Sequence, residues 1–517
     1  MARKWWTLAA VVTGLFMLLL DVTIVIVALP DIQSSLGSSL SDLQWVLDAY
    51  ALSLAVLLLT AGVLADRYGR RAYFAAGTAI FTLGSLSCAL AQTPLELTLS
   101  RAGQGVGGAM MFATSLALLG HTFRGRDRGI AFGVFGACAG VATAVGPVLG
   151  GVLVSLLSWR WIFLVNLPVG VVAIAITLVY VEESRDPVRR RLDWPGFLTF
   201  SLGLAALIYA LIRGGEDGWG SSIVLSCFVA AGVLLVGFVV TELVRRDPML
   251  DLALLRKPTF SGGLVAAFAM SGSLFALLTY VVIYFQTVLG YSAMETGVRV
   301  LILSGCTFLT AGAAGRLTSS VSPRALIAPG FVLVGAGLLV MRGLDASSGW
   351  THWIPGLILG GIGSGLINVP LASTAIGVVK PQRAGMASGI NSTFRQVGLA
   401  TGIAALGSIF AHQLRDGVAA ALDGTVAQSY TAGVLAGVGG PGGGRGPAGG
   451  ADMPPAAQEA IGRAIRSGFD GALNDILLIG AVVALVAAGI TAVTIRRRDF
   501  VDPAGEPDEG ELVNAAA

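Results

Sequence analysis

Long apolar runs separated by short polar stretches repeat along the chain. An α-helix needs roughly 20 apolar residues to cross the hydrocarbon core of a bilayer. Fourteen runs approach or exceed that length, at residues 6–29, 43–65, 72–91, 96–119, 129–154, 161–181, 195–213, 221–243, 259–285, 296–315, 324–342, 352–377, 385–411 and 473–495. The pattern predicts an all-α polytopic membrane protein with fourteen transmembrane helices.

The composition supports this interpretation, since 55% of the 517 residues are hydrophobic and only 12% are charged. A soluble core could not bury so much apolar surface. All four cysteines, Cys88, Cys138, Cys227 and Cys306, lie inside apolar runs, so we expect neither a disulfide framework nor a metal site. The run at 6–29 is too long for a cleaved signal peptide and is interpreted as a retained signal anchor.

Basic residues gather in every second polar stretch, and this distribution predicts the orientation of the chain. Cytoplasmic loops of membrane proteins carry an excess of Lys and Arg. The enriched stretches include Arg67 to Arg71, Arg124 to Arg128 and Arg496 to Arg498. With fourteen helices, both termini are expected in the cytoplasm. The Arg-rich, Lys-poor and Gly-rich composition further indicates the plasma membrane of a bacterium with high GC content.

Two polar interruptions divide the helices into groups. The charged stretch from Glu182 to Asp193 follows the sixth helix, and the amphipathic stretch from Asp247 to Pro258 follows the eighth. We therefore predict a six-helix bundle at 1–181, a linker with an inserted helix pair at 182–258, a second six-helix bundle at 259–495 and a disordered cytoplasmic tail at 496–517.

A long outer loop is predicted at 412–472, before the last helix. It contains a Gly-rich tract without the apolar content needed to fold around a core. Ile461, Ile465 and Phe469 follow one another at four-residue spacing, which indicates a short surface helix in the same loop.

A weak internal repeat relates the two predicted bundles. The segment Gly103 to Phe112 resembles the segment Gly360 to Pro370, and a shorter pair of segments begins at Arg128 and Arg383. Secondary transporters are built from such repeats, with the substrate site near the membrane midplane between the halves. We therefore expect a site at the interface of the two bundles.

The uncharged run at 129–154 contains a stripe of small residues at spacings of three or four. Such a stripe lets a second helix approach closely in lipid, and a proline within it removes one backbone hydrogen bond and favours a bend. The stripe is either a simple packing face or a hinge. The candidate hinge residues are Gly140, Gly146, Pro147, Gly150 and Gly151.

Charges within apolar runs are costly and usually functional, and four of them are candidates here. Asp21 lies well inside the first run, Asp48 near the outer end of the second, Arg101 in the fourth beside Gln104, and Arg395 in the thirteenth. Burial disfavours the charged form of a carboxylate, so a buried acid can carry a proton near neutral pH. The alternative for each residue is a structural ion pair or a hydrogen bond to a helix end.

The turn GVLADRYGRR, from Gly62 to Arg71, is the most specific motif in the chain. Its glycines allow close helix packing and a tight turn, and Asp66 can accept hydrogen bonds from a neighbouring helix end. We predict that this turn closes the inner side of the protein. The candidate gating residues are Gly62, Asp66, Arg67, Gly69, Arg70 and Arg128.

With this turn the chain resembles the major facilitator superfamily, whose loop between helices two and three has the form GxLADRxGRR. Arg101, Gln104 and the glycines after them resemble the superfamily's helix-four motif, and Ala139 to Gly151 resembles the helix-five motif of its antiporters. Leu20 to Pro30, Trp159 to Pro168 and the FRQVG motif at Phe394 resemble its fourteen-helix drug:proton antiporter family. The resemblance implies a major facilitator fold, proton-coupled export and a role for Arg101 in proton coupling.

The chain also departs from that family. Ile26 stands where the family usually has Asn, and Gly312 to Arg324, the second-half counterpart of the loop motif, lacks the acid. Helices nine to fourteen show no clearly embedded carboxylate, because Glu295, Asp345 and Asp475 all fall at predicted helix ends. We therefore expect monovalent cations, neutral compounds or zwitterions as substrates before dications.

The resulting hypothesis is a proton-coupled antiporter that exports amphipathic drugs or natural-product antibiotics from the cytoplasm. Asp21, Arg101 and Asp48 are the candidate proton-coupling residues. The candidate substrate-binding residues combine polar groups with flexible sulfurs and aromatic rings: Gln104, Met110, Met111, Phe112, Tyr280, Tyr284, Gln286, Asn368 and Arg395. The expected partners are the substrate, protons and the lipid bilayer, and the chain is expected to be a monomer. We expect no nucleic-acid partner and no cofactor besides the proton gradient.

Two alternatives remain open, a proton-coupled importer and a non-transporting membrane receptor. An ATP-driven pump is excluded because no phosphate-binding loop occurs; the three lysines, Lys4, Lys257 and Lys380, do not follow a glycine. No arrangement of nucleophile, base or metal ligands supports an enzyme.

Overall fold

The computed structural model describes residues 3–185, 193–245, 247–318, 320–345, 347–438 and 454–500. Its first part contains α1 (Arg3–Leu36), α2 (Leu40–Tyr68), α3 (Arg70–Leu90), α4 (Pro94–Thr122), α5 (Gly125–Leu156), α6 (Trp161–Leu164) and α7 (Asn166–Tyr180). The pair α8 (Trp194–Asp217) and α9 (Ser222–Val244) follows. The last part contains α10 (Pro258–Met270), α11 (Ala276–Thr287), α12 (Ala293–Leu317), α13 (Pro323–Val340), α14 (Ile354–Gly377), α15 (Ala384–Leu422), α16 (Thr431–Val438) and α17 (Pro455–Thr494).

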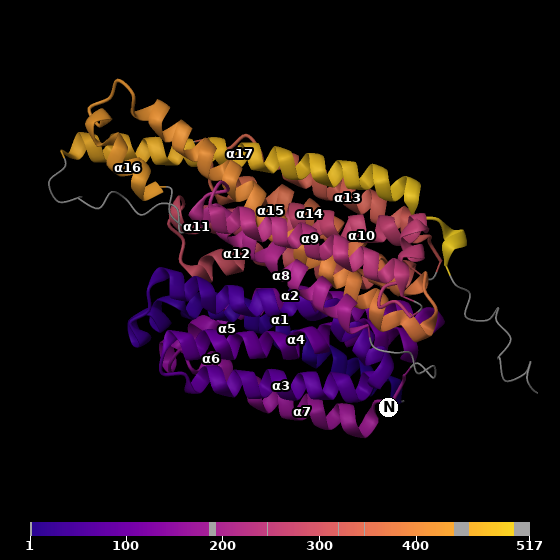
Figure 1. Cartoon of the computed structure of the whole chain (residues 1–517). Coiled ribbons are helices and arrows are strands. Elements are labelled where there is room, and N and C mark those ends of the chain that lie inside the picture. Colours follow the sequence, from indigo (N-terminus) through magenta and orange to yellow (C-terminus); the bar gives the residue numbers. More distant parts are fainter. Residues whose placement is uncertain are drawn as a thin grey trace, which may run out of the picture.

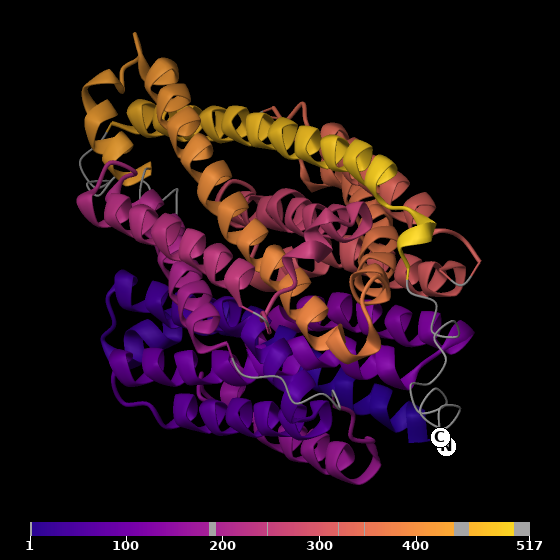
Figure 2. The ribbon, with the colours of Figure 1, turned by 45° about the vertical axis from the view of Figure 1, so that its right-hand side comes forward.

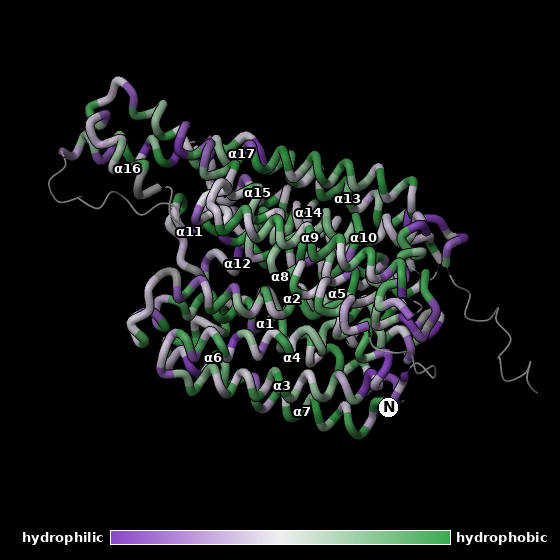
Figure 3. Tube along the Cα trace, in the orientation of Figure 1, coloured by the Kyte–Doolittle hydropathy of each residue, from purple (hydrophilic) through white to green (hydrophobic). Residues whose placement is uncertain are grey.

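Each of the fourteen predicted apolar runs coincides with helical structure. Within the described residues, thirteen helical segments are long and apolar enough to cross a membrane, and α5, a helix of 32 residues, occupies the remaining predicted run. Figure 3 shows apolar residues along the lengths of the helices and many of the polar residues near their ends. The prediction of an all-helical polytopic membrane protein is confirmed.

The helices form two side-by-side groups (Figure 1). Helices α1 to α7 pack together in one group and α10 to α17 in the other, while α8 packs against both α2 and α15. The main contacts between the groups join α2 to α15 and α5 to α12. Figure 2 shows the long α15 running obliquely from the far end of its own group toward the first group.

Close contacts between glycines bring the two groups together near the end of the molecule where α1 begins and α17 ends, which we call the termini face. A Cβ atom on Gly62 of α2 would lie 2.1 Å from the carbonyl oxygen of Gly385 on α15. A Cβ atom on Gly129 of α5 would lie 1.9 Å from the carbonyl oxygen of Gly315 on α12. No side chain fits at these positions, so glycine is what allows the backbones to meet.

Helical structure extends far into the segment 412–472, where a loop with one short surface helix was predicted. Helix α15 continues to Leu422, α16 follows, and α17 begins at Pro455 and runs unbroken into the last membrane-spanning run. Ile461 and Phe469, expected on a surface, are 3% and 1% exposed and pack in the hydrophobic core of the second group. Their four-residue spacing marks the buried face of a longer helix.

Parts of the predicted linker, the Gly-rich tract and the predicted tail, at 186–192, 439–453 and 501–517, lie outside the described residues.

The run predicted as one helix at 259–285 is divided by a π-helical turn, Ser271–Phe275, between α10 and α11. Gly272 in this turn lies against the backbone of α15, where an added Cβ would be 2.9 Å from the carbonyl oxygen of Gly398. A π-turn inserts an extra residue into a helix, and neither hydropathy nor spacing predicts it.

We expect Gly129→Val to destabilise the folded protein by about 1–3 kcal/mol, because the new side chain would collide with the α12 backbone. The measurement is thermal unfolding of the detergent-solubilised protein. Gly151→Val is the matched control on the same helix, since a Cβ at Gly151 meets no atom of the described residues within 4 Å. Equal melting temperatures for the two variants would contradict the role assigned to this contact.

Candidate functional site

Asp21 lies at the centre of a buried polar network within the first group of helices. Its side chain is fully buried, and both carboxylate oxygens accept hydrogen bonds. Arg101 Nη1 on α4 donates to Oδ2, whereas Gln104 Nε2 on α4 and Asn166 Nδ2 on α7 donate to Oδ1 at 2.7 and 3.1 Å. Three helices thus converge on one carboxylate.

Arg101 is held from several sides and is 1% exposed. Its Nε donates to the carbonyl oxygen of Val46 on α2 at 3.1 Å, and its Nη1 also donates to Gln104 Oε1 at 2.7 Å. The guanidinium carbon lies 4.2 Å from the centroid of the Tyr50 ring. Hydrogen bonds and a cation–π contact therefore compensate for removing this charge from water.

The position of α4 depends on two glycine contacts. A Cβ on Gly84 of α3 would lie 2.9 Å from the Cα of Gln104, and a Cβ on Gly105 of α4 would lie 2.6 Å from the carbonyl oxygen of Tyr50. Glycine at both positions lets α2 and α3 approach α4 closely. Arg101 and Gln104 are thereby brought within hydrogen-bond distance of α1.

The network has the chemistry of an ionised carboxylate. The groups that donate to Asp21 are a guanidinium and two amide NH₂ groups, and an ionised carboxylate accepts hydrogen bonds without donating any. A proton on Asp21 would need an acceptor where Arg101, Gln104 and Asn166 now present donors. Protonation of Asp21 would therefore require at least one of these contacts to break.

Asp66 forms a second buried acidic site, at the termini face. Its Oδ1 accepts from Arg70 Nε and Nη2 at 2.9 and 2.7 Å and from the backbone N–H of Gly385 at 2.9 Å. Its Oδ2 accepts from the N–H of Met386 at 2.9 Å. Asp66 on α2 thus caps the first turn of α15, where unpaired N–H groups favour an anion, and joins the two helix groups.

The remaining residues of the predicted gate surround this contact. Gly69 has φ +110° and forms the turn between α2 and α3, a conformation that side chains disfavour. Arg70 Nη2 also donates across the interface to the carbonyl oxygen of Gln382 at 3.4 Å. Arg128 on α5 donates to the carbonyl oxygen of Ser373 on α14 at 3.4 Å, and the Arg67 guanidinium lies 5.5 Å from the Tyr68 ring centroid.

The predicted hinge residues lie on the continuous helix α5 but contact different neighbours. Gly140 approaches α12, with its ideal Cβ 3.3 Å from the carbonyl oxygen of Ser304. Gly146 and Gly150 pack against Thr23 and Ile24 of α1, and Gly151 has open space. The side chain of Pro147 lies outside the described residues. The stripe is therefore shared between two interfaces, and its hinge role remains a prediction.

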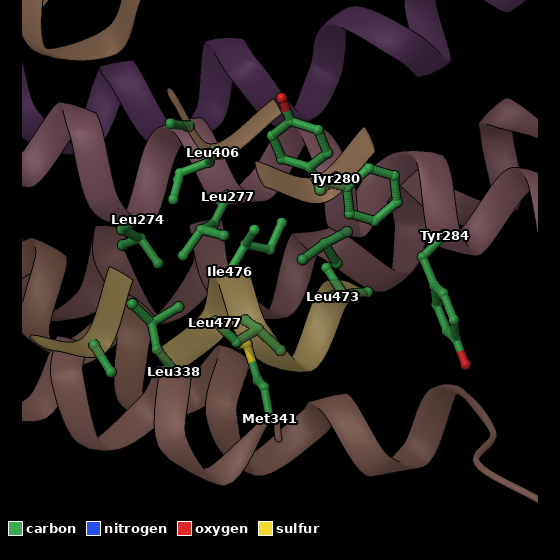
Figure 4. Packing of buried hydrophobic residues seen from close by; sticks show 14 of the residues in the cluster. Leu274, Leu277, Tyr280, Tyr284, Leu338, Met341, Leu406, Leu473, Ile476 and Leu477 are labelled. Atoms are coloured by element: carbon green, nitrogen blue, oxygen red, sulfur yellow. The ribbon is translucent and has the colours of Figure 1, made fainter. Parts of the chain in front are cut away.

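Most of the predicted substrate-binding residues pack against other side chains in this conformation. Met110 and Met111 are buried in the core of the first group, where Phe112 is half-buried. Tyr280 and Tyr284 belong to the large core of the second group (Figure 4), and the Tyr280 hydroxyl donates to the carbonyl oxygen of Ile403 at 2.8 Å.

The polar candidates have varied surroundings. Gln286 is exposed, and half-buried Asn368 donates to Ser364 Oγ at 3.0 Å. Asp48 is half-buried on α2, two residues before Tyr50. Arg395 on α15 is half-buried, and its guanidinium has no hydrogen-bond or ion-pair partner within the part of the chain that the structure describes.

Sequence reasoning missed several polar residues of the Asp21 network. Asn166 lies in the segment Trp159 to Pro168, which was noted only as a resemblance, and Ser85 Oγ accepts from Gln104 Nε2 at 2.8 Å. Asparagine and serine carry no charge, so neither stands out near or inside an apolar run. The family-like segment containing Asn166 was the only available signal.

The expectation that helices nine to fourteen hold no membrane-embedded carboxylate stays a prediction, but the placement of Asp475 at a helix end is wrong. Because α17 begins at Pro455, Asp470 and Asp475 lie inside a helix and not at its start. Asp470 is 4% exposed, and within the described part of the chain neither of its oxygens has a hydrogen-bond partner that meets standard geometry.

A second buried acidic pair was also missed. Asp193 and Glu242 are each 5% exposed and approach one another around Gly196. They lie where α8 begins and α9 ends, at the termini face. Within the described residues, no group of three or more His, Cys, Asp or Glu side chains could hold a metal ion.

Comparison with known proteins identifies the family. The sequence profile of the Major Facilitator Superfamily matches residues 11–403. The chain is 39% identical to the multidrug resistance protein Stp of Mycobacterium tuberculosis (strain CDC 1551 / Oshkosh), over 78% of this chain and 75% of that protein. It is 36% identical to the puromycin resistance protein pur8 of Streptomyces alboniger, over 84% and 89% of the two chains.

Two further comparisons extend this result. The tetracenomycin C resistance and export protein of Streptomyces glaucescens is 34% identical, over 80% of this chain and 77% of that protein. The crystal structure of the human organic anion transporter MFSD10 (TETRAN) matches with a TM-score of 0.59 and 15% identity, over 93% of this chain and 99% of that chain. At that identity the structural match concerns the fold alone. The chain belongs to the major facilitator superfamily, among its bacterial drug-efflux and antibiotic-resistance proteins.

Proposed function

We propose that this protein exports amphipathic drugs or natural-product antibiotics from the cytoplasm in exchange for protons. Three of its relatives are named for drug resistance or antibiotic export. The observation that carries the proton-coupled mechanism is Asp21, a fully buried carboxylate paired with Arg101. A chain that only spanned the membrane or packed its helices would need no such charge in its interior.

Asp21 is the proposed proton carrier. In this conformation its oxygens accept hydrogen bonds from Arg101, Gln104 and Asn166. Protonation would weaken its attraction to Arg101 and free that guanidinium to form other contacts. Arg101 thereby adjusts the proton affinity of Asp21, and substrate entry would return Asp21 to the ionised state.

The contacts of Asp66 support an outward-facing conformation. We propose that the termini face is cytoplasmic, because cytoplasmic loops carry an excess of Lys and Arg. At this face Asp66 and the paired glycines hold α2 against α15 and α5 against α12. Opening toward the cytoplasm would require these contacts to separate. These contacts, which we call the Asp66 latch, are therefore part of the proposed alternating access. The two halves of one chain can carry out this motion, so a monomer is sufficient.

Arg395 is proposed to contact the substrate. Around α15, Gly389 faces α2, Gly398 faces α10, and Phe394 packs in the cluster that contains α8. Arg395 lies on the opposite side from α8, with Ser388 and Ser392, whose buried hydroxyls have no hydrogen-bond partner among the described residues. We propose that this polar side faces the substrate pathway between the two helix groups. A free guanidinium there favours substrates with acidic, phenolic or carbonyl oxygens.

Transport in vesicles tests the proposed function. Purified protein is placed in liposomes with a pH gradient, and the movements of both substrate and protons are followed. Opposite fluxes of substrate and protons support the antiporter. Fluxes in the same direction would instead indicate the importer, and no flux for any of a panel of dyes, quaternary amines and natural products would favour the receptor.

We expect Asp21→Asn to abolish proton-coupled export in vesicles. Alone it leaves Arg101 as a buried cation without its counter-ion, at a cost of about 3–5 kcal/mol. The double variant with Arg101→Gln removes both charges and is expected to recover stability but not coupling. Asp31→Asn, at an exposed position on the same helix, should transport normally. Full coupling in the double variant would contradict the assignment.

We expect Asp66→Asn to shift the protein toward the inward-open state, because the amide group cannot accept all four hydrogen bonds that the carboxylate now accepts. A cysteine at the buried position Ser388 serves as the reporter. Its rate of alkylation from the cytoplasmic side should rise in Asp66→Asn and stay unchanged in Asp42→Asn, at the other end of α2. Unchanged labelling in Asp66→Asn would show that Asp66 is not a latch.

We expect Arg395→Gln to reduce export of acidic or phenolic substrates by about tenfold or more, since a charged hydrogen bond contributes roughly 1.5–3 kcal/mol. Neutral analogues of the same size should be affected less, and Arg395→Lys should retain part of the activity. The measurement is efflux from cells for a series of matched compounds. Equal losses for acidic and neutral members would exclude a direct contact with an acidic group.

A further inference from the structure

An open pocket of about 560 Å³ lies at the termini face, where α13 begins and α17 ends. Its lining combines three arginines with two aliphatic side chains and two residues at the start of α13: Ser322, Pro323, Arg324, Val493, Ile495, Arg496 and Arg498. It lies in the second helix group, away from Asp21 and Asp66. None of the functional roles described above involves it.

The pocket is strongly basic. The guanidinium groups of Arg324, Arg496 and Arg498 have no hydrogen-bond or ion-pair partner among the described residues, and no described carboxylate lines the pocket. The nearest acid in sequence, Asp499, accepts from the N–H and the hydroxyl of Thr259 at the start of α10, at 3.2 and 2.7 Å. The Asp499 carboxylate is therefore bound to Thr259 and does not pair with the arginines of the pocket.

The same contacts hold the arginine-bearing turn in place. The backbone N–H of Arg496 donates to Thr259 Oγ1 at 2.8 Å, and Thr259 itself is fully buried. A Cβ on Gly262, one turn later in α10, would lie 2.1 Å from Thr494 Oγ1, so α10 and the end of α17 are in close contact. The arginines thus project from a fixed backbone and not from a free tail.

One wall of the pocket continues into the apolar flank of the protein. Val493 is 66% exposed, and Val486 and Ile490 on the same helix are 55% and 36% exposed. Figure 3 shows this change along α17, from apolar residues on the helix to polar residues at its end. A ligand that fills the pocket can therefore place a charged group among the arginines and an apolar chain along α17.

The start of α13 adds to the preference for an anion. Ser322 precedes the helix and makes no side-chain hydrogen bond to its first turn. The first N–H groups of a helix are unpaired and carry partial positive charge. They point toward the same end of the molecule as the three guanidinium groups.

We propose that this pocket binds the headgroup of an anionic phospholipid from the adjacent leaflet, with its phosphate among Arg324, Arg496 and Arg498 and an acyl chain against Val493. Basic pockets between transmembrane helices recognise anionic headgroups in this way. A free phosphate ion would use the arginines but not the apolar wall. The inference does not depend on the transported substrate, since lipid binding is measured without transport.

The test is a titration of the full-length protein in neutral detergent with fluorescent phosphatidylglycerol, and with phosphatidylcholine of the same chain length. We expect saturable binding of phosphatidylglycerol only. The triple variant Arg324→Gln, Arg496→Gln, Arg498→Gln should bind on the order of a hundredfold more weakly, since each arginine near an anionic headgroup contributes roughly fivefold.

The matched control removes three arginines that lie outside the pocket, by Arg124→Gln, Arg185→Gln and Arg256→Gln. All three are exposed, and the variant should bind phosphatidylglycerol like the wild type. An equal loss in the two triple variants would mean diffuse attraction to the face and overturn the proposal. Equal binding of phosphatidylglycerol and phosphatidylcholine would also overturn the proposal.

Two further arms distinguish other occupants. Inorganic phosphate at millimolar concentration should leave lipid binding unchanged, and complete competition would assign the pocket to free phosphate. The chain beyond residue 500 contains five acidic residues and is the other possible occupant. Deletion of 501–517 should not alter the affinity, and a tenfold gain would assign the pocket to that segment and overturn the lipid assignment.

Discussion

The first helix group depends on the buried pair of Asp21 and Arg101. A lone charge cannot remain in the interior of a membrane protein without compensation. The helices around the pair must therefore supply hydrogen-bonding groups at the matching position along their axes. Helix α4 supplies Gln104, α7 supplies Asn166 and α2 supplies the carbonyl oxygen of Val46. The register of these helices is therefore constrained by hydrogen-bond geometry as well as by packing.

Helix α2 connects this pair to the closed face. It accepts a hydrogen bond from Arg101 at Val46 and, further along, caps α15 through Asp66. A rearrangement of Arg101 on protonation of Asp21 would change the contact at Val46 of α2. Separation of the two halves would break the contacts of Asp66 near the end of the same helix. In the proposed mechanism, one rigid helix therefore couples the protonation state to the conformation, with the glycine contacts at Gly62 and Gly129 keeping the closed state compact.

The sequence was most informative where a residue conflicts with its surroundings. Asp21 and Arg101 are charges within apolar runs, so the apolar pattern alone predicts their importance. The amide of Asn166 is neutral and could not be distinguished from an ordinary polar residue near a helix start. Asp470 was missed because the polar, amphipathic start of α17 has low hydropathy although it is helical and packed. Contacts between halves, such as Gly62 with Gly385, depend on tertiary geometry that local periodicity does not contain.

Proton release on substrate binding tests most directly whether Asp21 couples protons to export. Purified protein in weakly buffered detergent, at a series of starting pH values, is mixed with a transported compound while a pH-sensitive dye is monitored. The proposed mechanism predicts release of roughly one proton per protein molecule, and no release from the Asp21→Asn protein although it still binds the compound. Unchanged release from Asp21→Asn, or substrate binding to the wild type without any release, would contradict the coupling role of Asp21.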